Sequence, residues 1–429
     1  MADRRNFVKQ MAGVLGAFSL ANVIENSLNN NLEAAERDLS KISSDDAIMD
    51  NDFWHYIKNS YSASPNLINL NNGGVAPSPI IVQDALDKYN RMCNEAPSYY
   101  MWRILDQARE PLRQNLALLA GVDAEEIAIN RNSTEGLNTI IFGLNLEEGD
   151  EIILTKQDYP NMINAWKQRE KRDKIKLVWL DLEMPIPNEE YVVEQFTKAM
   201  TSKTKLVHIT HIINWNGQIM PARKIADVAH SKGIEVLVDG AHSFAHIDYK
   251  ISDLDCDYFA TSLHKWLSAP FGSGMMYIKK DKIKNIWALL SAPEPDGGDI
   301  RKFESLGTRS FPSEMAIGYA LDFHNLITTT RKQKRLHYLK KYWTDKCLDI
   351  PKFKLNTNTN DKNSCGISNF IIEGKEPAEI ENFLFDKYKI HTVSIIWANI
   401  KGVRVTPNVY TVTSDLDKLV DGIHKLAKL

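Results

Sequence analysis

The feature that most constrains this chain is a regular alternation, between residues 126 and 280, of short β-rich runs with longer amphipathic stretches. The spacing predicts seven strands, at residues 126–130, 150–156, 175–182, 204–212, 234–240, 257–262 and 273–280. Helix patterns separate several of them, and one pattern begins at Pro221 and ends at Gly233, as helices commonly do. Strands that alternate with helices predict an α/β fold with a mostly parallel sheet covered by helices.

The order of elements changes after about residue 330. A long charged helix pattern at 329–347 is followed by β-rich runs at 366–374 and 402–408, with a helix pattern at 377–388 between them. This order predicts a smaller α+β domain. We therefore expect a leader at 1–50, a large domain at 51–320 and a small C-terminal domain at 321–429. The segment that opens the large domain is a candidate for packing on the small one.

Composition excludes several classes of protein. The 429 residues are 43% hydrophobic and 25% charged, which is ordinary for a globular protein of this length. A net charge of −3 and the lack of a long basic run disfavour a nucleic-acid partner. Cys93, Cys256, Cys347 and Cys365 are widely spaced and form neither a zinc pattern nor a CxxC pair. We expect buried or free thiols, no metal and no disulfide framework.

The N-terminus resembles a twin-arginine export signal. Arg4 and Arg5 precede Phe7 and Lys9, and a weakly apolar run follows. That run is too short and too interrupted for a membrane span, so we expect no stable membrane insertion. The expected location is the periplasm. The alternative is a cytoplasmic protein whose N-terminus forms an amphipathic helix.

Polar residues follow five of the predicted strands, at the point where each strand ends. They lie at 131–136, 157–161, 211–218, 238–243 and 262–265. In open α/β sheets, ligands bind beyond the carboxyl ends of the strands. We therefore expect these residues to meet in one crevice.

Asp239 and Lys265 have the most specific chemistry of this set. Asp239 ends a β-rich run, where it is either a simple cap or a buried carboxylate in need of a cation. Lys265, in "TSLHKWLSAPFGSG", is either a surface-loop lysine or an amine that forms a Schiff base. An acidic partner for a pyridine nitrogen and a lysine for an aldehyde are the two requirements of a pyridoxal phosphate site.

The stretch "VDGAHSFAHIDYKISDLDCDYFATSLHKWLSAPFGSG" resembles the heart of the class V aminotransferase family of pyridoxal phosphate enzymes. Its D-G-A-H and H-K-W motifs resemble those of the isopenicillin N epimerase-like branch. The similarity extends from residue 68 to about residue 420. The resemblance implies the type I fold of pyridoxal phosphate transferases, an amino-acid-like small-molecule substrate and a homodimer.

The resemblance also assigns roles around the cofactor ring. Lys265 would form the Schiff base, Asp239 would pair with the pyridinium, and His242 would contact the cofactor face or its O3′ side. Tyr159 takes the position of the residue that stacks on the pyridine ring, and Asn214 that of the asparagine that binds O3′. A structural histidine and a core tyrosine remain the alternatives for His242 and Tyr159.

A second group of residues is expected to bind the cofactor phosphate. Ser133 and Thr134 begin a helix pattern, and a helix N-terminus presents free N–H groups to an anion. A plain helix cap is compatible with this role. Ser262 and His264 match the family's phosphate-side serine and histidine. Thr308, in "ESLGTRSFP", matches a segment that the neighbouring subunit contributes to the phosphate site.

The resemblance makes Arg404 the residue that binds the substrate carboxylate, for which a guanidinium is geometrically suited. Lys265 is the natural acid and base at the substrate Cα. Racemisation or epimerisation is the favoured outcome, and a class V aminotransferase is the alternative. A β-eliminating lyase and a non-catalytic binding protein are less favoured. Desulfuration is disfavoured because residues 391–405, where the family's desulfurases carry a nucleophilic cysteine, contain none.

Overall fold

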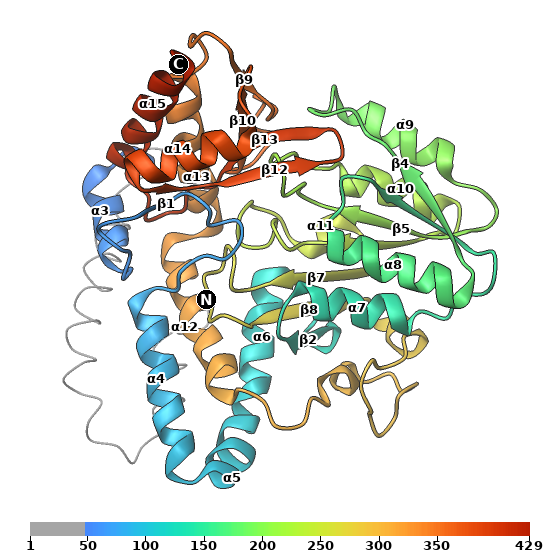
Figure 1. Cartoon of the computed structure of the whole chain (residues 1–429). Coiled ribbons are helices and arrows are strands. Elements are labelled where there is room, and N and C mark those ends of the chain that lie inside the picture. The colour runs from blue at the N-terminus through green and yellow to red at the C-terminus, as the bar shows by residue number, and fades with distance from the viewer. Residues whose placement is uncertain (1–47) are drawn as a thin grey trace. The chain divides into compact units, whose positions relative to one another are not determined.

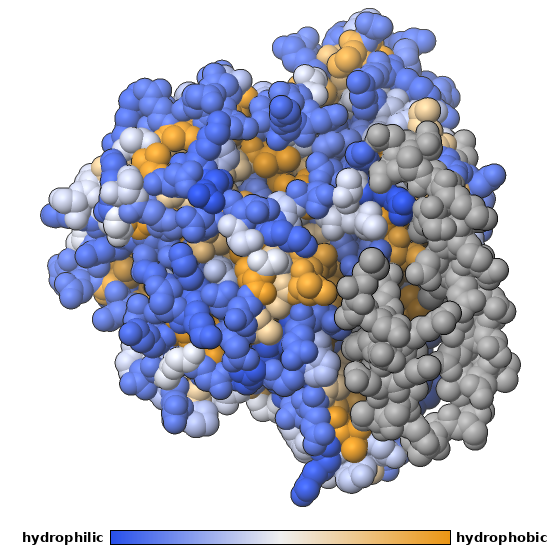
Figure 2. Space-filling model, turned by 180° about the vertical axis from the view of Figure 1, so that it is seen from behind, coloured by the Kyte–Doolittle hydropathy of each residue, from blue (hydrophilic) through white to orange (hydrophobic). Residues whose placement is uncertain are grey.

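The computed structural model describes residues 48–429. The twin-arginine motif and nearly all of the expected leader lie outside the described residues, so export stays a prediction. Among residues 48–429, no helix combines the length and the hydropathy needed to cross a membrane. On the face shown in Figure 2, hydrophilic residues cover most of the described surface that is visible, and hydrophobic residues form separate patches.

A seven-stranded sheet forms the centre of the larger part of the structure (Figure 1). Each of the seven β-rich runs predicted between residues 126 and 280 contains one strand. These strands are β2 (Ile127–Asn130), β3 (Glu151–Thr155), β4 (Lys176–Leu180), β5 (Thr204–Thr210), β6 (Glu235–Asp239), β7 (Tyr258–Ser262) and β8 (Gly274–Ile278). The spatial order is β2-β8-β7-β6-β5-β3-β4. Only β8 pairs antiparallel with its neighbours, β7 and β2. The mostly parallel α/β sheet is therefore confirmed.

Both faces of this sheet are buried. Because side chains alternate along a strand, Val236 and Val238 of β6 contribute to one hydrophobic core and Leu237 to the other. Buried side chains of five helices pack into the first core: α4 (Ile80–Glu95), α6 (Arg109–Ala120), α9 (Glu189–Ala199), α10 (Ala222–Ser231) and α12 (Phe311–Ile327). The other holds α7 (Ser133–Gly143) and α8 (Pro160–Asp173). Helices thus cover both faces, as expected for buried parallel strands.

The C-terminal part builds a separate antiparallel sheet with its own core. Its strands, in spatial order, are β12 (Val393–Trp397), β13 (Ile400–Val405), β10 (Ser368–Ile372) and β9 (Phe353–Leu355). Three helices pack with it: α13 (Thr329–Asp345), α14 (Pro377–Tyr388) and α15 (Thr413–Ala427). Figure 1 shows this small sheet and its helices beside the edge of the large sheet.

The beginning of the described chain contacts this C-terminal part. After α3 (Asn51–Asn59), the short strand β1 (Ile68–Asn69) pairs in parallel with β11 (Ile390–His391). The chain then returns to the large sheet through α4, which packs on α12. The helix α12 is continuous across residue 320, and α13 begins at Thr329. The domain limits themselves stay predictions.

A buried ion-pair cluster fixes the segment that leads into α12. Glu304, at the end of the short helix η6 (Ile300–Glu304), accepts hydrogen bonds of 2.6 and 2.8 Å from the two terminal nitrogens of Arg113. Arg109 lies 3.0 Å from the same carboxylate, and Ile129 of β2 donates its backbone N–H to it. The Arg113 and Glu304 side chains are only 0% and 3% exposed. Arg109 also pairs with Glu314 and Arg113 with Glu110, so removal of Glu304 would leave two buried cations with one carboxylate each.

We predict that Glu304→Ala lowers the free energy of unfolding by about 3–5 kcal/mol, because it breaks the buried pair with Arg113 and leaves Arg109 with Glu314 alone and Arg113 with the part-exposed Glu110. Urea denaturation followed by circular dichroism measures this loss. Asp227→Ala is the matched control, because it breaks the half-exposed Arg223–Asp227 pair on α10, where solvent replaces the lost partner. Equal losses in the two variants would show that the buried cluster does not stabilise the fold.

Candidate active site

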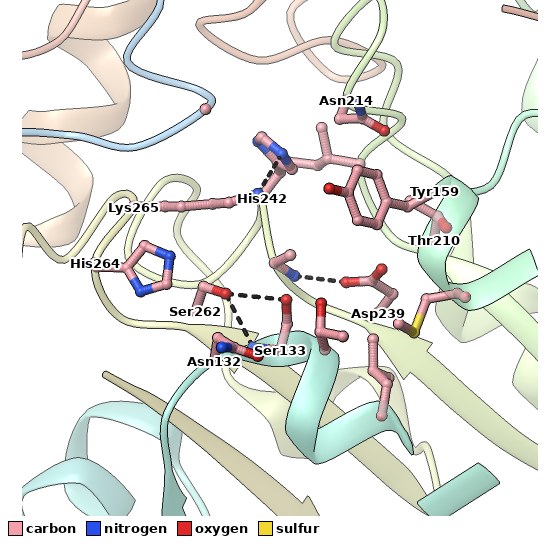
Figure 3. A pocket seen from close by; sticks show the side chains of 16 residues that line it. Asn132, Ser133, Tyr159, Thr210, Asn214, Asp239, His242, Ser262, His264 and Lys265 are labelled. Atoms are coloured by element: carbon pink, nitrogen blue, oxygen red, sulfur yellow. Dashed lines mark hydrogen bonds between the residues drawn. The ribbon is translucent and has the colours of Figure 1, made fainter. Parts of the chain in front are cut away.

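The carboxyl ends of the parallel strands surround a cavity of about 230 Å³. The residues that line it come from the N-terminus of α7, the start of α8 and the segments after β5, β6 and β7. Nine of the eleven predicted site residues are among them: Ser133, Thr134, Tyr159, Asn214, Asp239, His242, Ser262, His264 and Lys265. Figure 3 shows the labelled members of this set facing one space. The expected convergence of strand ends thus produces a single pocket.

One end of the pocket suits an anion. Asn132 caps α7 by accepting the Glu135 N–H, so the helix begins beside the cavity. The Ser262 hydroxyl accepts the Ser133 N–H at 2.9 Å and donates to the Ser133 hydroxyl at 2.9 Å (Figure 3). These hydroxyls and the positive end of the helix dipole present donors and partial positive charge to a phosphate. Asn132 was not predicted, although its place before a helix pattern was a signal.

His264 lies beside this anion-binding end. Its Nδ1 donates to the Ser273 carbonyl at 3.0 Å, so a neutral ring carries no proton on Nε2. Burial lowers the pKa of His264, and the adjacent Lys265 lowers it further. A bound phosphate dianion would oppose both effects and favour the protonated ring, which donates from both nitrogens.

Asp239 lies at the floor of the pocket, at the end of β6. One of its oxygens accepts the Ala241 N–H at 2.9 Å (Figure 3). Burial raises the pKa of Asp239, while the Ala241 N–H, His208 and Lys265 oppose that rise. A buried carboxylate of this kind gains most from a cationic ligand atom. A pyridinium nitrogen is such an atom.

Lys265 and His242 form the opposite wall. The Lys265 Nζ lies 2.9 Å from the His242 Nε2 (Figure 3). The pKa of Lys265 is lowered to about 8, chiefly by burial; Asp239 opposes this change and Arg404 contributes to it. A substantial fraction of this amine is therefore neutral near physiological pH, as a nucleophile requires.

Tyr159 enters the pocket from the side facing Lys265, and its hydroxyl points into the cavity (Figure 3). It stands directly before α8, which begins at Pro160. Its ring stacks on Trp215 with centroids 6.4 Å apart and an angle of 29° between the planes. The next residue back, Asp158, is buried and accepts hydrogen bonds from the Thr210 hydroxyl and the Thr155 N–H. This support was not predicted, although Asp158 belongs to a strand-end segment.

Arg404, on β13, lies directly behind Asn214 and does not line the cavity. Its two terminal nitrogens donate to the Asn214 carbonyl at 3.1 Å and to the Asn71 side-chain oxygen at 2.9 Å. Burial lowers the pKa of Arg404 to about 10, and Tyr159 opposes that change. Asn71 also contacts the His391 ring at 3.3 Å. Sequence reasoning missed Asn71, whose partners lie more than 300 residues away.

Three buried polar atoms at this wall test what the pocket can hold. The Arg404 Nε and the Asn214 side-chain oxygen have no hydrogen-bond partner within residues 48–429, and the same is true of His208 Nε2 behind Asp239. A buried polar atom of this kind needs a partner that the described chain does not supply, and a ligand, an ion or a water can be that partner. Together with the anion-binding end, the buried carboxylate and the lysine, the donor set fits pyridoxal phosphate.

Thr308 does not join the pocket of its own chain. It is exposed, in the segment between η6 and α12. The four cysteines are buried, and none lines the cavity. Burial raises the pKa of Cys365 to about 12, so its thiol is not a nucleophile here. Among the described residues, no group of three or more histidine, cysteine or acidic side chains is arranged to hold a metal ion.

Known proteins resemble the chain over most of its length. Isopenicillin N epimerase from Streptomyces clavuligerus is 26% identical over 392 residues, which cover 87% of this chain and 98% of that protein. A protein named "probable cysteine desulfurase" from Halalkalibacterium halodurans is 28% identical over 391 residues, with 84% and 93% covered.

Solved structures agree on the fold. A cysteine desulfurase from Escherichia coli superposes with a TM-score of 0.78 at 20% identity, covering 87% of this chain and 98% of that one. A cystine C–S lyase with cysteine persulfide gives 0.74 at 22% identity, with 84% and 98% covered. The family model described as aminotransferase class-V matches residues 68–396. The chain therefore belongs to the class V aminotransferase family of pyridoxal phosphate enzymes.

Proposed function

We propose that this protein uses pyridoxal phosphate to racemise or epimerise an amino acid or an amino-acid-like substrate at Cα. The observation that carries the proposal is that Lys265 and Tyr159 bring proton-bearing groups into one pocket from opposite sides (Figure 3). Inversion at Cα needs a proton removed on one face and another delivered on the other. Similarity to isopenicillin N epimerases over most of the chain supports the same reading.

The pocket residues divide the binding of the cofactor among them. In this proposal, Ser133, Thr134, Ser262 and His264 bind the phosphate at the N-terminus of α7. Asp239 pairs with the pyridine nitrogen and keeps it protonated. Asn214 and His242 bind the O3′ side, and Tyr159 packs against the ring. When bound, pyridoxal phosphate accepts the electrons that Cα releases with its proton.

Arg404 and Lys265 act on the substrate. Arg404 would bind the α-carboxylate through its Nε, which has no hydrogen-bond partner among the described residues, although the residue lies behind Asn214 and outside the cavity lining. Lys265 removes the Cα proton, for which its lowered pKa is suited. The Tyr159 hydroxyl returns a proton to the other face.

Two other outcomes are possible for the same site, and they make different demands on it. Transamination needs one face only, so Lys265 alone would suffice. Desulfuration needs a thiolate at the substrate, whereas the four cysteines of this chain are buried outside the pocket. The buried cysteines favour epimerisation or transamination over desulfuration.

We also propose that the protein is a homodimer in which Thr308 contacts the phosphate in the neighbouring subunit. Thr308 is exposed and lies outside its own pocket, as a residue that serves a second subunit must. Most soluble oligomers are symmetric homo-oligomers, and a twofold axis would supply each pocket with one such segment.

Lys265→Ala is predicted to abolish the visible absorption band that a bound cofactor gives to the protein, because no amine remains to bond to the aldehyde. The spectrum is recorded on purified wild type and variant, each with added pyridoxal phosphate. Lys198→Ala, on the exposed face of α9, is the control and should keep the band. A wild type that stays colourless with added cofactor would disprove the cofactor assignment.

Tyr159→Phe is predicted to retain the cofactor but to slow interconversion of the two substrate configurations by about 10²–10⁴-fold, the usual contribution of one acid–base group. Proton NMR in D₂O, combined with chiral chromatography, follows exchange at Cα and inversion separately. Exchange should persist through Lys265 while inversion falls.

Tyr191→Phe removes a hydroxyl outside the pocket and serves as the control. Unchanged inversion in Tyr159→Phe would remove Tyr159 from the mechanism. Accumulation of a keto acid and an aminated cofactor in wild type would identify an aminotransferase instead.

A mixture of Thr308→Asp and Lys265→Ala proteins is predicted to recover activity that neither has alone. Random reassembly of dimers makes half of them mixed, and each mixed dimer has one pocket with an intact Lys265 and an intact neighbouring Thr308. Recovery to about a quarter of the wild-type rate follows from twofold symmetry. Activity is assayed before and after subunit exchange. No recovery after confirmed exchange would show that Thr308 does not serve the neighbouring pocket.

A further inference from the structure

Trp266, the residue directly after Lys265, makes a contact that bears on the pocket. Its side chain is only 1% exposed. The indole Nε1 donates a hydrogen bond to the His242 Nδ1 at 3.4 Å. On the other side of the same imidazole, Nε2 lies 2.9 Å from the Lys265 Nζ. His242 therefore stands between a tryptophan donor and the lysine amine.

The contacts of His242 determine which of its two ring nitrogens carries the proton. An indole N–H can only donate, so the His242 Nδ1 must accept and carries no proton. Burial lowers the pKa of His242 well below its usual range, and Lys265, Arg404 and His246 lower it further, so the ring is neutral. A neutral imidazole carries one proton, which is left on Nε2. That Nε2–H can donate to Lys265 only if the lysine offers a lone pair.

We propose that Trp266 is a positioning residue that holds His242 in its Nε2–H tautomer, so that His242 donates to the Lys265 amine and keeps it neutral. The mechanistic value of this device rests on the proposed function, in which Lys265 is the nucleophile and the base at Cα. The tautomer itself does not depend on that function.

Several contacts hold the Trp266 ring in place. The His246 ring stacks on it with centroids 3.5 Å apart and an angle of 24° between the planes. His246 is itself fixed, because its Nδ1 donates to the His242 carbonyl at 2.8 Å and its Nε2 accepts the Gly366 N–H at 3.1 Å. Lys332, on α13, donates its Nζ to the Trp266 carbonyl at 2.6 Å. The indole therefore cannot turn away from His242 without losing its stack on His246, and Lys332 fixes the Trp266 backbone.

Other titratable groups act on the same pair and set the background for a measurement. Around Lys265 and His242 these are Asp239 on β6, Arg404 on β13, and His246 and His264 in the adjoining segments, while Tyr159, before α8, acts on Arg404. Asp239 stabilises the ammonium form of Lys265, whereas burial and Arg404 oppose it. A donor at the His242 Nε2 acts in the same direction as burial.

Trp266→Phe tests the proposal because it removes the indole N–H and keeps an aromatic ring against His246. Without the donor, His242 can place its proton on Nδ1 and accept from a Lys265 ammonium through Nε2. We expect ¹⁵N NMR of ring-labelled histidine in the full-length protein to show loss of the pure Nε2–H tautomer. The pH midpoint for acylation of Lys265, measured by peptide mass spectrometry, should rise by about one pH unit. A shift of that size corresponds to the free energy of about one hydrogen bond.

A matched control exists in the same chain. The Trp166 Nε1 donates to the His208 Nδ1, also at 3.4 Å and also fully buried, but Trp166 does not line the pocket. Trp166→Phe removes the same kind of hydrogen bond from the opposite core. It should leave the His242 tautomer unchanged.

A double-mutant cycle distinguishes an effect of Trp266 that passes through His242 from a general disturbance of the structure around Lys265. If Trp266 acts through His242, then Trp266→Phe should not shift the Lys265 midpoint in a His242→Phe background. An equal shift in that background would overturn the proposal. So would an Nδ1–H tautomer of His242 in the wild type, which needs no variant and therefore decides the matter even if Trp266→Phe fails to fold.

The same spectra keep this inference separate from the proposed function. They are recorded on the full-length chain without cofactor and again after loading. A protein that never binds pyridoxal phosphate would end the proposed function, while its cofactor-free spectrum would still show which nitrogen of His242 is protonated.

Discussion

The common direction of the central strands is the constraint on which the rest of this structure depends. Because β5, β6 and β7 run parallel, the residues that follow them leave the sheet at the same edge. Asn214, Asp239 and Lys265 therefore meet, although the chain passes through other elements between them. The antiparallel strand β8 then closes the sheet against β2, and so brings the start of α7 next to Ser262. A ligand bound here contacts every one of these segments.

The pocket keeps its charged groups away from water before any ligand binds. Asp239 and Arg404 are buried and Lys265 is half-buried, and burial disfavours the charged form of each of them. Groups held in this state need no solvent reorganisation when a charged ligand arrives, which is how preorganised sites gain their electrostatic effect. The hydrophobic cores on both faces of the sheet offset the free-energy cost of burying these charged groups.

Much of this could be read from the sequence, for physical reasons. Long β-rich runs between helix patterns predict strands well, and the ends of parallel strands must share an edge, so nine site residues were found before any coordinates. The strands β1, β9 and β11 were missed because two or three residues are too few to show a strand pattern, and the five-residue strand β12 was missed as well. The contacts of Asn71 with Arg404 and of Trp266 with His242 were missed for another reason: they depend on how distant segments pack, which no local pattern encodes.

The pairing of β1 with β11 has a consequence for biosynthesis. Residues 68–69 find their partners only at 390–391, and Asn71 contacts an arginine at position 404. A ribosome adds residues in order, and contacts between distant segments form late. The wall of the pocket that contains Arg404 therefore assembles only after β13, more than 300 residues downstream of Asn71, has been synthesised. A cofactor that needs the finished pocket must wait for that segment.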